Sequence, residues 1–119
     1  MPVGISIGEI EFYTTVAPGE MTLISDPFTA EAEPDQAYIV LWEEDVDSVT
    51  LDTDLKAWAT CDGTTFAQAT LTEAATIGSG RILTGTADVS AQIGTSMVWK
   101  ITTHNNKQLK VHAVGLEWS

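Results

Sequence analysis

"LKAWATC", residues 55–61, shows most clearly the pattern that decides the fold. Small or apolar side chains stand at every second position from Leu55 to Cys61, and Lys56, Trp58 and Thr60 stand between them. Successive side chains of a β-strand point to opposite faces. The alternation therefore predicts a strand with one buried face.

The same period recurs along most of the chain, in short runs separated by Gly, Pro, Asn and Asp. The runs are "SIGEIEFYTTV" (6–16), "AYIVLW" (37–42), "FAQATL" (66–71), "RILTGTADV" (81–89), "MVWKITT" (97–103) and "QLKVHAVGLEWS" (108–119). No segment carries a helical stripe of useful length. We therefore predict an all-β fold, an antiparallel β-sandwich of jelly-roll-like type with about eight strands.

Turns and one irregularity can also be placed. Asp62-Gly63 and the Asn-rich run 103–108 suit tight hairpins, because Asn, Asp and Gly tolerate a left-handed backbone. In the last run the apolar residues change parity after Val111. A shift of one residue exchanges the faces of a strand, which predicts a bulge near residues 113–115 or a strand buried on both sides.

The 119 residues form one domain of common size. We divide them into an N-terminal arm or strand (1–19) and a β-sandwich domain (20–119). The start lacks the basic and apolar regions of a signal peptide, and no apolar run approaches the length of a membrane helix. We expect synthesis in the host cytoplasm and no membrane partner.

Charge is distributed very unevenly along the chain. Residues 1–55 hold thirteen acids and no Lys or Arg, whereas residues 56–119 hold four acids and five bases. Nucleic-acid phosphates repel a chain with a net charge of -12. Nucleic acid is therefore not expected as a partner, and solubility or pairing with a basic protein surface is favoured.

The densest acidic run is "WEEDVDSVTLDTD", residues 42–54. An EF-hand fails in either register, because Val49 or Lys56 stands where an acid is needed. A glycosidase pair would need carboxylates held around a sugar. Here the acids alternate with Val and Leu, so we expect most of them to face water. An irregular calcium site stays open.

Other candidate sites are weaker. "GISIG" (4–8) matches a nucleophile elbow, but a β-pattern follows Ser6 where a helix is required. His104 and His112 flank a hairpin at offsets too large to share a metal within one chain. Cys61 continues the buried face of its strand. We predict no catalytic residue, no metal ligand and no cofactor, and a non-enzymatic protein.

The four tryptophans divide by parity. Trp99 shares its parity with Met97 and Ile101 and should lie in the core. Trp58 lies opposite the small residues of its strand, so it faces a second sheet or a partner. Trp42 and Trp58 could also form a sugar-binding surface, since aromatic rings serve cores, interfaces and ligands alike.

Two segments resemble a domain found in virion proteins of tailed bacteriophages. They are "DVDSVTLDTDLKAWATCDGTTFAQATL" and "GTSMVWKITTHNNKQLKVHAVGLEWS", within a similarity that spans roughly residues 20–119. The family's hairpin usually has a second Gly and a Trp, whereas this one is shorter and ends in Phe66. The resemblance implies a structural β-sandwich that assembles as a multimer on the virion.

These observations lead to one functional prediction and one alternative. The prediction is a capsid decoration (cement) protein on the outer surface of the head. It would act as a homotrimer and bind the major capsid protein or another virion protein. The predicted contact residues are Ile5, Ile7, Ile10, Phe12, Tyr13 and Trp58, because an apolar alternating arm suits strand addition. The alternative is a carbohydrate- or receptor-binding module of a tail or head fibre.

Overall fold

The computed structural model describes residues 20–119 in full and the backbone of residues 6–16. It contains nine strands, joined by turns and loops. The strands are β1 (Ser6–Val16), β2 (Thr22–Ile24), β3 (Phe28–Thr29), β4 (Gln36–Asp45), β5 (Leu55–Thr60), β6 (Ala67–Ile77), β7 (Gly80–Asp88), β8 (Ser96–Thr103) and β9 (Leu109–Trp118). No helix occurs within these described residues. The predicted all-β class is confirmed.

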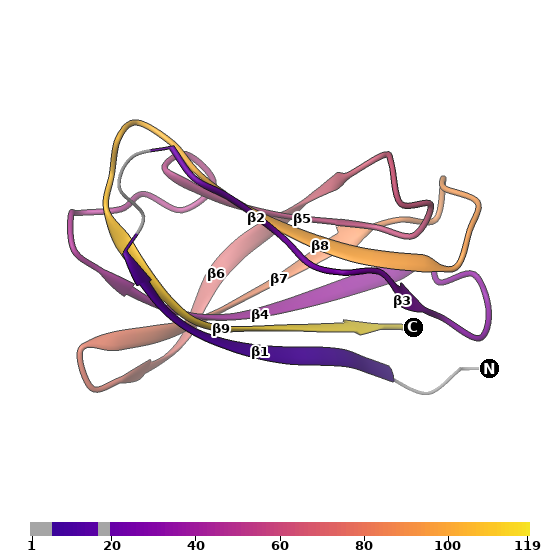
Figure 1. The fold of residues 1–119 in the computed structure, drawn as a ribbon, viewed down its shortest axis with the longest axis horizontal. Coiled ribbons are helices and arrows are strands. Elements are labelled where there is room, and N and C mark those ends of the chain that lie inside the picture. Colours follow the sequence, from indigo (N-terminus) through magenta and orange to yellow (C-terminus); the bar gives the residue numbers. More distant parts are fainter. Residues whose placement is uncertain (1–5, 17–19) are drawn as a thin grey trace.

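All strand pairs are antiparallel, and the hydrogen-bonded order is β1-β9-β4-β7-β6-β5-β8-β2, with β3 also paired to β8. The sheet curls into two layers (Figure 1). One layer contains β1, β9, β4 and β7, and the other contains β5, β8, β2 and β3. The predicted antiparallel sandwich is thus confirmed, and its two layers are parts of one curled sheet.

Strand β6 connects the two layers. Residues 70–77 pair with β7, whereas residues 67–69 pair with β5. The far half of the β6–β7 hairpin extends beyond the rest of the molecule (Figure 1). Its apolar side chain Ile77 is 48% exposed.

The core lies between the layers and is formed by the alternating positions. In β5, the residues Leu55, Ala57 and Ala59 are fully buried, as the sequence predicts. Cys61 continues this face, and burial raises the pKa of its thiol. The largest fully buried side chain is Trp99, so its predicted place in the core is confirmed.

The turns follow the backbone preferences of their residues. Asn105 and Asn106 have φ values of 62° and 56°, and Gly63 has a φ of 83°. These left-handed values require Asn or Gly for low strain. The carboxylate of Asp62 holds the second turn, because it accepts hydrogen bonds from the backbone N–H groups after Gly63.

The change of parity in β9 is a bulge. Trp42 pairs with Ala113 and Glu43 pairs with Val111, so His112 is the additional residue. The bulge therefore lies slightly before the predicted region 113–115. It brings both Val111 and Val114 onto the buried face.

Candidate functional site

The acidic run 42–54 contains one carboxylate that the sequence pattern misplaces. Glu43 is fully buried in β4, although the alternation with Val and Leu suggested a surface position. It shares its parity with Ile39 and Leu41, which are core residues of the same strand. Asp54 is buried as well, with 5% exposure. The prediction that charge faces outward is wrong for these two residues.

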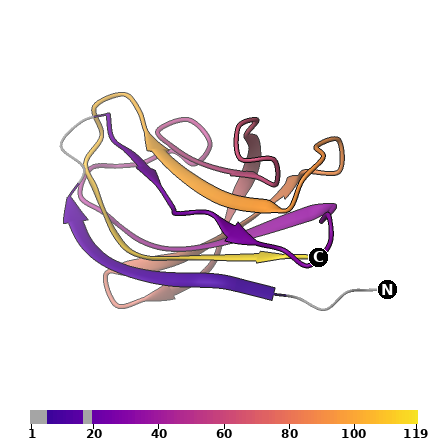
Figure 2. The same cartoon turned by 45° about the vertical axis from the view of Figure 1, so that its right-hand side comes forward.

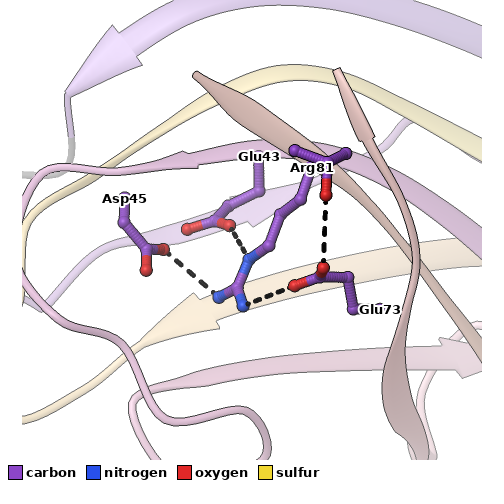
Figure 3. Close-up of polar contacts among 5 residues, drawn as sticks. Glu43, Asp45, Glu73 and Arg81 are labelled. Atoms are coloured by element: carbon purple, nitrogen blue, oxygen red, sulfur yellow. Dashed lines mark hydrogen bonds and ion pairs between the residues drawn. The ribbon is translucent and has the colours of Figure 1, made fainter. Parts of the chain in front are cut away.

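Arg81 on β7 is the hydrogen-bond partner of the buried Glu43 carboxyl group. Its Nε donates to Oε1 of Glu43 at 2.7 Å, and its two terminal nitrogens reach Asp45 at 3.2 Å and Glu73 at 3.4 Å. Figure 3 shows the guanidinium between these three side chains, which come from β4 and β6. Register explains the arrangement, because Glu43 and Arg81 are directly opposed in the β4–β7 pair.

The carboxyl group of Glu43 has unusual acidity. Its pKa is raised to about 8, mainly by burial and also by the nearby Asp45 carboxylate, while the hydrogen bond from Arg81 opposes the shift. Its second oxygen, Oε2, has no hydrogen-bond partner among the described residues. A buried acceptor without a donor favours protonation. Three carboxylates around one guanidinium also carry more negative charge than Arg81 neutralises.

Two further acids of the run, Asp52 and Asp54, accept hydrogen bonds from backbone N–H groups. Asp54 accepts a hydrogen bond from the Thr50 N–H at 2.9 Å and another from the Asn105 side chain at 2.7 Å. Asp52, in a left-handed conformation, accepts from the N–H of Leu71. These contacts tie the loop between β4 and β5 to two neighbouring hairpins, which is a structural role.

The cluster around Arg81 does not have the form of a metal site. Among the described residues no group of three or more His, Cys, Asp or Glu side chains is arranged to hold an ion. A hollow of about 290 Å³ lies beside the cluster, lined by Asp45, Glu73, Thr76, Ser79, Gly80 and Arg81. The cationic guanidinium at the wall of this hollow would repel a metal ion. It already binds the neighbouring carboxylates through charge-assisted hydrogen bonds.

The two histidines lie in different surroundings. His104 Nε2 contacts the hydroxyl of Thr102 at 2.9 Å. His112 Nε2 contacts Glu44 at 3.1 Å, and its ring lies 4.9 Å from that of Trp42. The hydrogen bond with the His112 imidazole lowers the pKa of Glu44, and burial raises it. The net result is a lowered pKa. Each histidine thus has its own local partner.

Trp58 lies on the outer face of β5 and is half-buried. Its indole N–H donates to the hydroxyl of Thr102 at 3.0 Å. The Lys100 ammonium lies 5.0 Å from the Trp58 ring centroid and 4.3 Å from that of Phe66. Trp58 therefore faces away from the second layer. The sequence pattern did not decide whether Trp58 faces a second sheet or a partner, because its cationic neighbour Lys100 lies on β8, far away in the sequence.

The other predicted contact residues belong to the arm. Ile7, Ile10, Phe12 and Tyr13 lie in β1, which pairs with β9 as an edge strand of the chain's own sheet. Their side chains, and the whole of Ile5, are outside the described part of the structure. Ser6 begins this strand, so the nucleophile-elbow match has the wrong context. The partner-binding role of the arm stays a prediction.

Residues 6–16 and 20–119 include no helix long and apolar enough to cross a membrane. Neither a family model nor a curated protein matches the chain.

Proposed function

We propose that this protein is a non-enzymatic component of a phage virion, most specifically a capsid decoration protein that binds and stabilises the head lattice. The resemblance of residues 20–119 to accessory virion domains supports the assignment of this protein to a virion. The roles of the described acids support a structural protein, because Glu43, Asp52 and Asp54 are engaged in contacts within the chain. Their arrangement serves the fold and leaves no pair poised around a substrate.

The position of β1 carries the proposal. It is the terminal strand of the sheet order, with β9 on one side and no strand on the other among the described residues. An open edge presents backbone N–H and C=O groups that a strand of another protein can pair with. Ile7, Ile10, Phe12 and Tyr13 in this strand would provide the side-chain selectivity of such a contact.

Co-sedimentation with undecorated heads tests the proposal. We expect the purified protein to pellet with the heads, at a copy number comparable to that of the major capsid protein. Deletion of residues 1–14 should abolish pelleting, and circular dichroism must show that the remaining sandwich is folded. Failure to co-sediment, or unchanged binding of a folded deletion variant, contradicts it.

The fibre-type alternative depends on Trp58 as a surface for sugars. Stacking of a sugar requires an open ring face, and Lys100 occupies space over the rings of both Trp58 and Phe66. This geometry favours an anionic group over a neutral sugar. A glycan array with Trp58→Ala as the control distinguishes the two, because specific binding that the substitution abolishes would place the alternative first.

A further inference from the structure

The outer face of β5, β8 and β2 combines aromatic, aliphatic and cationic side chains. We define the cationic face as Lys56, Trp58, Phe66, Lys100 and Ile24. Trp58, Lys100 and Ile24 stand side by side in one cross-strand row, because Lys100 pairs with Trp58 on one side and with Ile24 on the other. Ile24 is 58% exposed. Exposed apolar and aromatic groups in one patch are typical of protein interfaces.

The two lysines of this face differ from the other bases of the chain. Arg81 contacts three carboxylates, and Lys110 lies 3.8 Å from Glu44. Lys107 acts on Asp54, whose pKa is lowered by hydrogen bonds and further by this ammonium. Lys56 and Lys100 have no ion pair with any residue that the structure describes. The cationic face therefore carries two positive charges that have no carboxylate partner among the described residues.

Uncompensated negative charge lies on the segments that flank β3. We define the acidic segment as Asp26, Glu31, Glu33 and Asp35, all of which are exposed. None of their carboxylates forms an ion pair within the described residues. The segment flanks β3, which together with β2 forms the edge of the sheet order opposite to β1 (Figure 2).

We propose that the cationic face of one copy binds the acidic segment of a second copy, in a head-to-tail contact. The proposal deepens the proposed function by naming the surface through which decoration subunits meet each other. Two different surfaces are involved, so the contact is heterologous and closes into a ring when the rotation per subunit allows it. This leaves the β1 edge free for the head lattice.

Charge and shape favour this occupant over other anions. The chain is strongly acidic, so copies repel one another unless a cationic surface meets an acidic one. Lys100 lies over the two rings and has no ion pair among the described residues, so its ammonium can pair with a carboxylate of another copy. Ile24 and Trp58 beside it supply apolar area that a protein segment can cover. A nucleic acid would meet the repulsion of the whole chain.

The experiment measures the mass of the purified full chain by light scattering and native mass spectrometry, at low salt and at about 0.5 M salt. We expect a closed oligomer at low salt that dissociates as salt is added. Lys100→Glu combined with Lys56→Glu should weaken association about ten- to hundredfold. Glu31→Lys combined with Glu33→Lys should weaken it similarly. The protein carrying all four changes should associate again, because the charges are exchanged.

Lys107→Glu serves as the matched control, since it changes the same charge outside the cationic face and should leave association unchanged. A wild-type monomer at low salt, or an oligomer that survives either charge reversal, overturns the proposal. Failure of the four-fold variant to reassociate also overturns it. Binding of an acidic glycan by a monomeric wild type, lost in Lys100→Glu, would assign the face to that ligand instead.

Co-sedimentation separates this proposal from the proposed function. Oligomers that fail to bind heads would support the interface between copies and contradict the decoration role. Head binding by a wild type that stays monomeric would support the decoration role and contradict the interface.

Discussion

Arg81 and Lys100 show two ways in which a strongly acidic chain uses its few bases. Arg81 is surrounded by Glu43, Asp45 and Glu73, and its side chain is only 18% exposed. Lys100 lies over two aromatic rings and has no carboxylate partner among the described residues. The first base neutralises charge inside the molecule, and the second leaves positive charge available to another molecule.

The strongest test of this difference removes Arg81. Arg81→Met should lower the free energy of unfolding by about 3 kcal/mol near pH 8, because Glu43 then has no cation or donor in a buried position. Urea unfolding followed by tryptophan fluorescence measures the change. The double variant Glu43→Leu with Arg81→Met should recover most of the loss, since a buried ion pair can be replaced by apolar packing. A loss below about 1 kcal/mol in the single variant would contradict the role of Arg81.

The second prediction concerns pH. The pKa of Glu43 is raised from 4.5 to about 8 by burial, so the folded protein holds a proton that the unfolded chain releases between these values. Stability must therefore fall as pH rises through this window, by at most about 1.4 kcal/mol per pH unit from this group. Denaturant midpoints at about pH 5.5, 7 and 8.5 measure the slope.

Glu43→Gln is the matched control for the pH experiment, since it keeps the shape and removes the titration. Its midpoint should be nearly independent of pH across that window. Below it, loss of stability should come from other carboxylates, such as those of Glu44 and Asp54, whose pKa values are lowered. A wild type whose stability rises between about pH 5.5 and 8 would contradict a protonated Glu43.

The same region shows how far the sequence alone leads. Period two predicts the strands, the buried face of β5, the core position of Trp99 and the bulge of β9, because each follows from local alternation. It also contained a signal for Glu43, which shares its parity with Ile39 and Leu41. Parity alone does not predict the burial of an acid, because a buried acid needs a partner and Arg81 lies 38 residues away in the sequence. The short strands β2 and β3 carry too few residues for a period.

The cationic face could be predicted only in part. Parity places Trp58 away from the small residues of its strand, but the row with Lys100 and Ile24 depends on which strands become neighbours. That choice is made by long-range pairing of β5, β8 and β2. The lack of an ion pair at Lys100 is likewise a property of the folded chain, since acids are abundant in the sequence.

A smaller effect is expected at the rim of the Arg81 cluster. Glu73 contacts Arg81 at 3.4 Å, but its side chain is 48% exposed. Solvent screens such a pair, so Glu73→Gln should cost about 0.5 kcal/mol or less. Urea unfolding at matched pH measures it, with Glu117→Gln as a control for removal of an outer carboxylate. A cost near that of Arg81→Met would mean that the cluster acts as one cooperative unit.

The smallest effect on folding should follow changes at Lys100. Lys100→Met removes the charge but keeps a chain that packs on Trp58 and Phe66, so the free energy of unfolding should change by about 0.5 kcal/mol or less at micromolar protein. Thermal melts at increasing protein concentration add the decisive comparison. If copies associate through this face, the wild-type melting temperature must rise with concentration, because association stabilises the folded form by mass action. Lys100→Glu should remove that rise and leave the dilute melting temperature in place. If the melting temperature of Lys100→Glu still rises with concentration, Lys100 serves neither the fold nor the contact between copies. The proposed difference from Arg81 would then be wrong.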